Sequence, residues 1–338
     1  MYNHKKTLFS TLQGLGNSII QWPIIEALSH RTDLTVAVMK NGSSKFYKEL
    51  GYKVVEISNR KDIVFKLGLK KYDLFLTPCP SWKRECLASL VTLSNKKTLN
   101  IHSDKRYSIL LPSQNINVSD PFTHDIENTT ESLKQYDLTL EDISVAKEAI
   151  KKKYLDPALQ NEKYVIFHPT ASSEYKFYSK EFWIDLASKF SQLGYGVYIV
   201  SGPVKKEQDF CLQILEKIPT ATYLKNAEFS KLCRLIRNAN YFIGLDSSIM
   251  HLAATLDCQL VALWSFANFR RIYPYGMNAK IYLPEEVLKA KEFKYPKKEL
   301  KELKRANAQD IIQIIQNDMK SSLQLVSKLV GPIHCYKF

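Results

Sequence analysis

The fold of this chain follows from Gly244-Leu245-Asp246-Ser247-Ser248-Ile249-Met250-His251-Leu252-Ala253-Ala254-Thr255-Leu256. The pattern predicts a buried strand ending at Leu245, which turns sharply into a helix that begins near Ser247. A polar cluster therefore lies at the carboxyl end of a strand and the amino end of a helix, where open α/β sheets bind ligands. Unpaired N–H groups and the helix dipole favour a phosphate there. Because Asp246 and His251 add hydrogen-bonding groups that a plain turn would not need, we expect a site for an anionic, nucleotide-like ligand.

Length and composition restrict the class of protein. The chain has 338 residues, of which 45% are hydrophobic and 24% charged, as is typical of a soluble globular protein with two domains. We expect neither a signal peptide nor an anchor at the amino terminus, and no apolar run is long enough to span a bilayer. The six cysteines show no CxxC pairing, which favours reduced thiols in a cytoplasmic protein.

The formal net charge of +14 is compatible with two interpretations. One is a lysine-rich, solvated surface. The other is an anionic partner, either a charged ligand or an anionic membrane surface. The sequence carries no signature of a nucleic-acid-binding module, so we expect no nucleic-acid partner.

Short apolar runs alternate with helical patterns through both halves of the chain, which is typical of parallel sheets. In the first half, the patterns predict strands at 7–12, 34–39, 54–57 and 74–77, and helices at 19–29, 45–50, 63–69, 126–136 and 146–154. After a linker at 156–163, they predict strands at 164–167, 196–200, 241–245 and 259–264, and helices at 180–193, 206–217, 229–238, 250–256 and 308–329. We therefore expect two doubly wound α/β domains facing across a cleft.

The expected domain bounds follow from these elements. The N-terminal domain comprises residues 1–155 and the C-terminal domain residues 156–307. Residues 308–338 form a C-terminal helix and tail. One expected arrangement is that this segment packs back on the N-terminal domain.

A second polar turn follows the strand that ends at Phe167. Its loop Thr170-Ala171-Ser172-Ser173 supplies hydroxyls and N–H groups, and Lys176 adds one positive charge, a combination that suits a diphosphate. The alternative is an ordinary loop in which Ser179 caps the next helix.

A third polar turn follows the strand that ends at Val200. Gly202 begins this turn, and Glu207 falls in the first turn of the next helix. An acidic group at a strand end can bind ribose hydroxyls, although a carboxylate there can also simply complement the helix dipole. Because the three turns lie on the carboxyl edge of one predicted sheet, one nucleotide can touch all of them.

In the first half, Gly14-Leu15-Gly16-Asn17 forms a glycine-containing turn between a strand and a helix. A dinucleotide fingerprint needs a third glycine at the position of Ile19, so a nicotinamide-binding loop is not indicated. The alternatives left open are a tight structural turn and a close approach to a ligand.

In this order, the motifs resemble those of glycosyltransferase family nine, the heptosyltransferase-like enzymes of lipopolysaccharide synthesis. The family's His-Pro-Gly-Ala-Ser-Ser block is similar to His168-Pro169-Thr170-Ala171-Ser172-Ser173, and its Gly-Gly-Pro turn to Ser201-Gly202-Pro203. Its Asp-Thr-Gly-x-x-His-Leu-Ala-Ala block, the most specific part, resembles Asp246 to Ala254. In the first half, Leu15-Gly16-Asn17 with Pro23 resembles the family's Leu-Gly-Asp…Pro motif.

The resemblance implies the two-domain GT-B fold, with a sugar nucleotide in the second domain and an acceptor in the first. It also implies inverting transfer, with heptose as the expected sugar and without a metal ion or a cofactor, so protein groups must neutralise the leaving diphosphate. The donor-binding residues are then Thr170, Ala171, Ser172, Ser173, Lys176, Gly202, Glu207, Asp246, Ser247, Ser248 and His251. We assign to the acceptor Gly16, Ser18, Lys105 and Arg106.

The chain departs from the family at the expected general base. The family commonly has an aspartate where this chain has Asn17, and an amide cannot take a proton at neutral pH. One account is that Asn17 orients the acceptor hydroxyl with weak assistance from elsewhere. Another is that the base is a different group of the first domain. The candidates for that base are Glu127, Asp125, His124 and Asp104.

The leading hypothesis is a cytoplasmic glycosyltransferase that moves a heptose to a glycan or lipid-linked acceptor. The basic surface would draw it to the inner face of the cytoplasmic membrane. A rival of the same fold is a sugar-nucleotide epimerase or hydrolase. A rival of another class is a non-catalytic or regulatory protein that keeps the nucleotide pocket and has lost the base.

Overall fold

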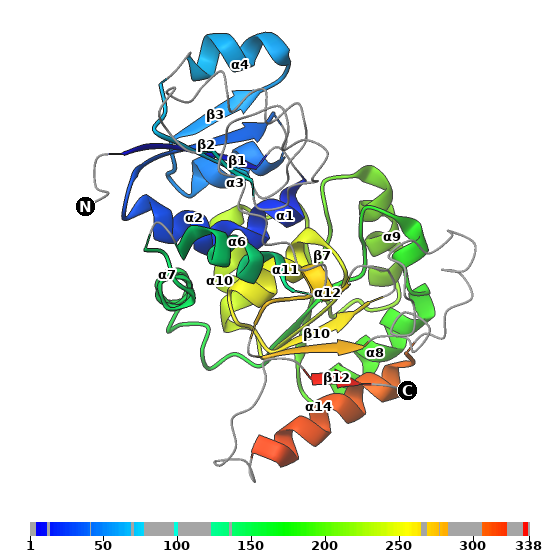
Figure 1. The fold of residues 1–338 in the computed structure, drawn as a ribbon. Coiled ribbons are helices and arrows are strands. Elements are labelled where there is room, and N and C mark those ends of the chain that lie inside the picture. Colours follow the sequence, from blue (N-terminus) through cyan, green and yellow to red (C-terminus); the bar gives the residue numbers. More distant parts are fainter. Residues whose placement is uncertain are drawn as a thin grey trace. The chain divides into compact units, whose positions relative to one another are not determined.

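The computed structural model describes residues 5–11, 14–40, 42–68, 71–77, 98–100, 123–134, 137–264, 269–276, 278–282, 306–322 and 334–336. The chain divides into two compact units. The first comprises Met1–Ile150 with Arg270–Tyr273, and the second comprises Lys151–Phe269 with Pro274–Phe338. Each unit contains one parallel sheet with helices packed against it (Figure 1), which confirms the predicted fold class of two parallel-sheet α/β domains.

The sheet of the first unit has the strand order β3-β2-β1-β4-β5, and its pairings are parallel. Its strands are β1 (Lys6–Thr11), β2 (Asp33–Met39), β3 (Val54–Ile57), β4 (Leu74–Thr77) and β5 (Thr98–Asn100). The helices of this part of the chain are α1 (Leu15–Ile20), α2 (Trp22–Ser29), α3 (Gly42–Glu49), α4 (Arg60–Leu67), α6 (Asp125–Leu133) and α7 (Leu140–Lys153). In the central strand β1, Leu8 and Phe9 point to opposite faces and are both fully buried, as expected of a sheet covered on both sides.

One helix predicted in the first unit is in fact two. The sequence predicted a helix over 19–29, whereas α1 begins at Leu15 and α2 begins at Trp22. Pro23 lies in the first turn of α2 and has no N–H to donate to an earlier carbonyl, so the first helix ends before it. Gly16 and Asn17 therefore belong to helix α1, not to a turn that precedes it.

The sheet of the second unit has the strand order β12-β11-β10-β9-β6-β7-β8, again with parallel pairings. Its strands are β6 (Tyr164–His168), β7 (Gly196–Val200), β8 (Thr222–Leu224), β9 (Tyr241–Leu245), β10 (Leu260–Leu263), β11 (Ala279–Tyr282) and β12 (His334–Tyr336). The helices that follow β6 are η2 (Glu174–Lys176, a 3₁₀ turn), α8 (Lys180–Gln192), α9 (Lys205–Leu215), α10 (Phe229–Asn238), α11 (Ser248–Thr255), α12 (Phe269–Ile272) and α14 (Ala308–Ser322).

The main core of the second unit lies between its sheet and the helices α8, α9 and α14. Trp183 and Phe190 of α8 pack on Phe167 of β6, with ring centroids 5.7 and 5.6 Å apart. Ile311 and Ile315 of α14 are buried in the same cluster, and α14 contacts α8 (Figure 1). The apolar face of the C-terminal helix therefore completes the core of the second unit.

Several bounds differ from those predicted. The division between the units falls after Ile150, within helix α7, and residues 270–273 return to the first unit. The short strands β5, β8, β11 and β12 were not predicted, because runs of three or four residues carry little periodic signal. Among the described residues, no helix is long and apolar enough to cross a membrane.

Candidate functional site

The three polar turns of the second unit lie side by side at the carboxyl edge of its sheet. Strand β6 pairs with β7 on one side and with β9 on the other, so the turns that follow these strands are neighbours. The strand order also reverses here, because the chain continues from β6 to β7 and β8 before it crosses to β9. In open α/β sheets, ligands bind at such a reversal. The structure thus brings together the sequence segments expected to hold the donor.

The turn after β9 presents the amino end of helix α11. Ser247 caps this helix, because its Oγ accepts a hydrogen bond from the Met250 N–H at 3.3 Å. Ser248 and Ile249 open the helix and are partly exposed, and N–H groups at these positions have no partner within a helix. They are donors suited to an anionic oxygen.

An ion pair stands beside this helix end. Lys176, at the end of η2, has its Nζ 2.5 Å from Asp246 Oδ2 and 3.2 Å from Asp246 O. Both side chains are largely buried, with 15% and 8% of their surface exposed. His251 Nε2 lies 3.9 Å from the other carboxylate oxygen, Asp246 Oδ1. A cation and a carboxylate are therefore held next to the donors of α11.

Two buried histidines belong to the site: His251 lies beside the ion pair, and His168 lies beside Ser247. Burial lowers the pKa of His168 to about 4 and that of His251 to about 4, so both rings are neutral near pH 7. Asp246 opposes the shift of His251, but burial outweighs it. His168 Nδ1 lies 3.1 Å from Ser247 Oγ. His168 was not among the expected donor-binding residues. A signal for it existed, since it is the polar residue that ends a fully buried strand.

Glu207 joins the turns after β6 and β7. Its Oε2 accepts hydrogen bonds from the Gly202 N–H at 3.1 Å and from Thr170 Oγ1 at 3.4 Å. Burial raises the pKa of Glu207, an effect that these two hydrogen bonds oppose. A Cβ atom at position 202 would collide with Glu207 Oε2, so only glycine fits there while this contact is made. The two sequence motifs are thus parts of one structure.

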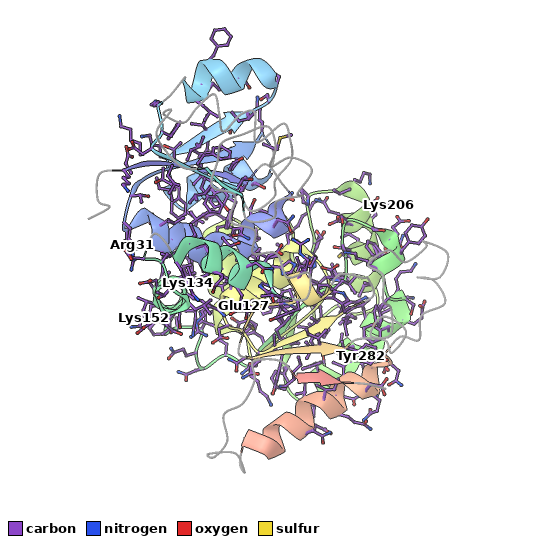
Figure 2. The ribbon with its side chains drawn as sticks, viewed as in Figure 1. Arg31, Glu127, Lys134, Lys152, Lys206 and Tyr282 are labelled. Carbon is purple, nitrogen blue, oxygen red and sulfur yellow. The ribbon has the colours of Figure 1, made fainter. Side chains whose placement is uncertain are left out.

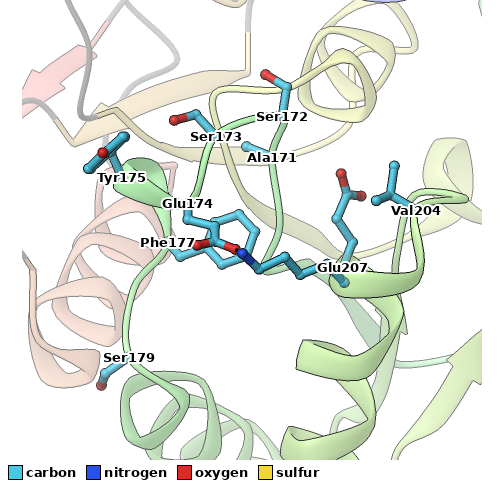
Figure 3. Close-up of a pocket in the computed structure, with 10 residues that line it drawn as sticks. Ala171, Ser172, Ser173, Glu174, Tyr175, Phe177, Ser179, Val204 and Glu207 are labelled. Carbon is cyan, nitrogen blue, oxygen red and sulfur yellow. Dashed lines mark ion pairs between the residues drawn. The ribbon is translucent and has the colours of Figure 1, made fainter. Parts of the chain in front are cut away.

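A pocket of about 880 Å³ opens between the loop that follows β6 and the amino end of α9 (Figure 3). Figure 3 shows Glu207 and Val204 on one side of it and Tyr175 and Ser179 on the other. The pocket is lined by Ala171, Ser172, Ser173, Glu174, Tyr175, Phe177, Ser179, Val204, Lys206 and Glu207. Aromatic rings, hydroxyls and a carboxylate in one pocket suit a nucleoside, whose base is flat and whose ribose carries hydroxyls.

The expected acceptor and base positions of the first unit are only partly described. Asn17 is partly exposed on α1, whereas Ser18 is fully buried. The carbonyl of Ser18 accepts a hydrogen bond from the Tyr47 hydroxyl at 2.8 Å, which fixes this part of the helix. Asp104, Lys105 and Arg106 lie outside the described residues.

Two of the expected base candidates hold a distant segment of the chain. His124 Nδ1 accepts a hydrogen bond from the Ile126 N–H at 3.1 Å, and its Nε2 donates to Tyr273 O at 2.9 Å. Asp125 Oδ1 accepts from Arg271 Nε at 3.0 Å and from Arg271 Nη2 at 2.9 Å. These contacts engage the groups that a base would need free, so they favour a structural role for both residues.

Glu127 lies in the first turn of α6 (Figure 2) and is partly buried. It is therefore the third of the expected base candidates that the structure places at the start of this helix. Among the described residues, no group of three or more His, Cys, Asp or Glu side chains could hold a metal ion.

The chain is similar to known glycosyltransferases in sequence. The pattern of glycosyltransferase family 9 (heptosyltransferase) matches residues 61–303. Lipopolysaccharide heptosyltransferase 3 of Escherichia coli is 26% identical over 241 residues, which cover 66% of this chain and 68% of that protein.

Solved structures show the same fold. A glycosyltransferase family 9 protein of Veillonella parvula superimposes with a TM-score of 0.68 at 17% identity, covering 95% of this chain and 98% of that one. The E. coli heptosyltransferase WaaC with ADP gives a TM-score of 0.69 at 15% identity, covering 92% and 99%. Because the family pattern spans most of the sequence, this chain is a glycosyltransferase of family 9, the heptosyltransferase family.

Proposed function

We propose that this protein transfers a heptose from ADP-heptose, or a closely related sugar nucleotide, to a saccharide of lipopolysaccharide type, with inversion and without a metal ion. Two relatives support the substrates: one is named as a lipopolysaccharide heptosyltransferase, and another was solved with ADP. The observation that carries the proposal is the group of Lys176, Asp246 and the amino end of α11 at the reversal between β6 and β9.

The diphosphate would bind in this group. The Lys176 ammonium supplies one positive charge, and the first N–H groups of α11 supply donors for phosphate oxygens. The loop from Thr170 to Ser173 adds the hydroxyls of Ser172 and Ser173 and further N–H groups. As the bond to the sugar breaks, negative charge grows on the leaving diphosphate, and these fixed donors stabilise it. A metal ion is then not needed for that step.

The nucleoside would occupy the neighbouring pocket of about 880 Å³. Glu207 stands at its edge and offers carboxylate oxygens to the ribose hydroxyls. Burial raises the pKa of Glu207 because water solvates its carboxylate poorly. Hydrogen bonds from the ribose hydroxyls would supply the solvation that water does not. Tyr175 and Phe177 provide aromatic surface for the base.

The acceptor would bind in the first unit, near Gly16 and Ser18 of α1. Asn17 can orient an acceptor hydroxyl through its amide but cannot remove the proton. We propose Glu127 as the base, because it is a partly exposed carboxylate in the first turn of α6, and Asp104 remains the other candidate carboxylate. Lys105 and Arg106 remain proposed acceptor contacts.

We also propose that the enzyme works in the cytoplasm at the inner membrane face, where a lipid-linked acceptor is presented. The net charge of +14 supports attraction to anionic lipid. Binding to vesicles that contain anionic lipid should then weaken as ionic strength rises. Absence of binding at low ionic strength would remove the membrane part of the proposal.

The test is calorimetric binding of ADP and ADP-heptose, followed by turnover with a heptose-accepting lipopolysaccharide core, each with and without EDTA. We expect saturable binding of both nucleotides and transfer that EDTA does not inhibit. Binding without turnover on any acceptor would favour a non-catalytic nucleotide-binding protein, and release of free sugar without acceptor would favour a hydrolase. Loss of activity with EDTA would contradict metal-independent transfer.

A further inference from the structure

We propose that His168 is a positioning residue of the donor site: its Nδ1–H donates a hydrogen bond to Ser247 Oγ, which turns the serine proton toward a phosphate oxygen of the donor. This rests on the proposed function, because it concerns the same diphosphate site. His168 itself need not touch the ligand.

The hydrogen-bonding capacity of Ser247 carries the argument. A serine hydroxyl has one proton to donate and two lone pairs to accept with. One lone pair accepts from the Met250 N–H at 3.3 Å, the bond that caps α11. The other faces His168 Nδ1 at 3.1 Å. If that nitrogen carries a proton, both lone pairs are filled, and the serine proton points away from them. It is then available to a ligand, because Ser247 is partly exposed.

The opposite tautomer would remove a hydrogen-bond donor from the anion site. With the proton of His168 on Nε2, Ser247 would donate its own proton to Nδ1. The hydroxyl of Ser247 could then not donate a hydrogen bond to a phosphate oxygen. Because phosphate oxygens are acceptors, binding selects the tautomer with Nδ1–H.

The surrounding structure is built to hold this ring. His168 ends the buried strand β6 and pairs in register with Gly244 of β9. A Cβ atom on Gly244 would lie 3.2 Å from His168 Cβ and 2.7 Å from Phe242 Cε1. The adjacent strand therefore carries no side chain beside His168, where a Cβ atom would crowd the histidine that contacts Ser247.

The ring is neutral under working conditions, so the tautomer decides its role. Burial lowers the pKa of His168 to about 4, and a neutral ring has a single N–H. The charged groups of the site, Lys176 and Asp246, pair with each other. His251, the other buried histidine of the site, faces Asp246.

The tautomer can be measured directly. In protein with ¹⁵N-labelled histidine, the His168 ring nitrogens should show a protonated Nδ1 and an unprotonated Nε2 when ADP saturates the site. Assignment rests on the signals that vanish in His168→Asn. An Nε2–H tautomer in the ADP complex would overturn the proposal, whatever the affinity of the variants.

Affinity supplies the second readout, measured as the Kd of ADP by calorimetry. We expect His168→Leu and Ser247→Val each to raise the Kd on the order of tenfold, the effect of losing one charge-assisted hydrogen bond. His168→Asn, whose amide can donate from a similar position, and Ser247→Thr, which keeps the hydroxyl, should stay within about threefold of the parent. The double variant His168→Leu/Ser247→Val should be no weaker than either single one, because both remove the same interaction.

A matched control separates this effect from loss of stability. Leu186→Ala truncates a fully buried residue of α8 in the core of the same unit. It should lower the Tm without changing the Kd of ADP. His168 does not act through Ser247 if His168→Leu binds ADP with the affinity of the parent. The same conclusion follows if the losses of ADP affinity in His168→Leu and Ser247→Val add in full in the double variant. If the parent protein binds no ADP, the proposed function fails instead.

Discussion

Lys176 and Asp246 stand 70 residues apart in the sequence, yet Lys176 Nζ lies 2.5 Å from Asp246 Oδ2 at the carboxyl edge of the second sheet. The lysine comes from the turn after β6 and the aspartate from the end of β9, the two strands between which the order reverses. A largely buried cation is thus held by a carboxylate. A diphosphate that binds there must share Lys176 with Asp246.

The first prediction concerns Lys176→Met, which removes the cation that Asp246 and the diphosphate would share. It should weaken ADP binding on the order of tenfold or more, because the diphosphate loses the ammonium group of Lys176. It should also lower the Tm, since Asp246 is left buried without its cation. Calorimetry at two salt concentrations and a thermal melt measure the two effects.

Two variants serve as controls for that prediction. Lys176→Arg keeps the charge and should retain more affinity than Lys176→Met. Lys205→Met removes an equal charge that pairs with Asp209 on the exposed face of α9, and it should leave the Kd of ADP within about twofold, as expected for a surface pair. Unchanged ADP affinity in Lys176→Met would show that the diphosphate binds elsewhere.

A second prediction concerns acid stability. The pKa values of His168 and His251 fall from the ordinary 6.5 to about 4 in the folded protein, because burial disfavours the charged rings. The unfolded chain therefore takes up these protons first as the pH falls. Their contribution to stability is fully present above about pH 6.5 and is lost progressively toward pH 4, a change on the order of a few kcal/mol.

Denaturant titrations between pH 7.5 and 4.5 measure this loss, with the fluorescence of the buried Trp183 and Trp264 as the signal from the second unit. His168→Asn, which cannot take up a proton, should show a shallower fall of the midpoint with pH than the parent protein. Parallel curves for the two proteins would contradict the assignment of this dependence to His168.

A third prediction tests the packing around Gly244. In Gly244→Ala the new Cβ would lie 2.7 Å from Phe242 Cε1 and 3.2 Å from His168 Cβ, so the Phe242 ring must shift and His168 must move slightly. We expect a loss of about 1–3 kcal/mol of stability, typical of overpacking in a core, and weaker ADP binding as His168 moves away from Ser247. Gly196→Ala is the matched control, because its Cβ would meet its neighbours at 3.6 Å or more. Equal stability of the two variants would contradict this account.

The arrangement of the donor segments could be predicted from the sequence. Apolar runs ending at Phe167, Val200 and Leu245 mark buried strands, and parallel strands bring their carboxyl ends to one edge. The individual contacts could not be predicted. That Lys176 pairs with Asp246, and that His168 lies beside Ser247, depends on β6 and β9 being neighbours, which the local pattern does not encode.

In the first unit, too, the contacts of the site residues could not be predicted from the local sequence. His124 and Asp125 suit a base by residue type, but they contact Tyr273 and Arg271, which are 149 and 146 residues away in the sequence. No local feature of the sequence predicts these contacts with Tyr273 and Arg271. The start of α7, by contrast, carried a local signal, although the helix was predicted to begin only at residue 146. Thr139 Oγ1 accepts from the N–H of Asp142, whose carboxylate accepts from the Thr139 N–H, a reciprocal cap that a Thr-x-x-Asp spacing indicates.

The last prediction concerns the base. If Glu127 removes the acceptor proton, Glu127→Gln should lower kcat about 10²- to 10⁴-fold while leaving the Kd of ADP unchanged, since general-base catalysis supplies a factor of that size. Glu131→Gln, on the same helix and paired with Lys134 at the surface, is the control and should keep its kcat. Asn17→Asp adds the carboxylate that the family commonly has, and it should restore part of the rate to Glu127→Gln. Full activity in Glu127→Gln would exclude this carboxylate. A large gain from Asn17→Asp in the parent protein would then mean that the natural enzyme relies on orientation by Asn17 with little base assistance.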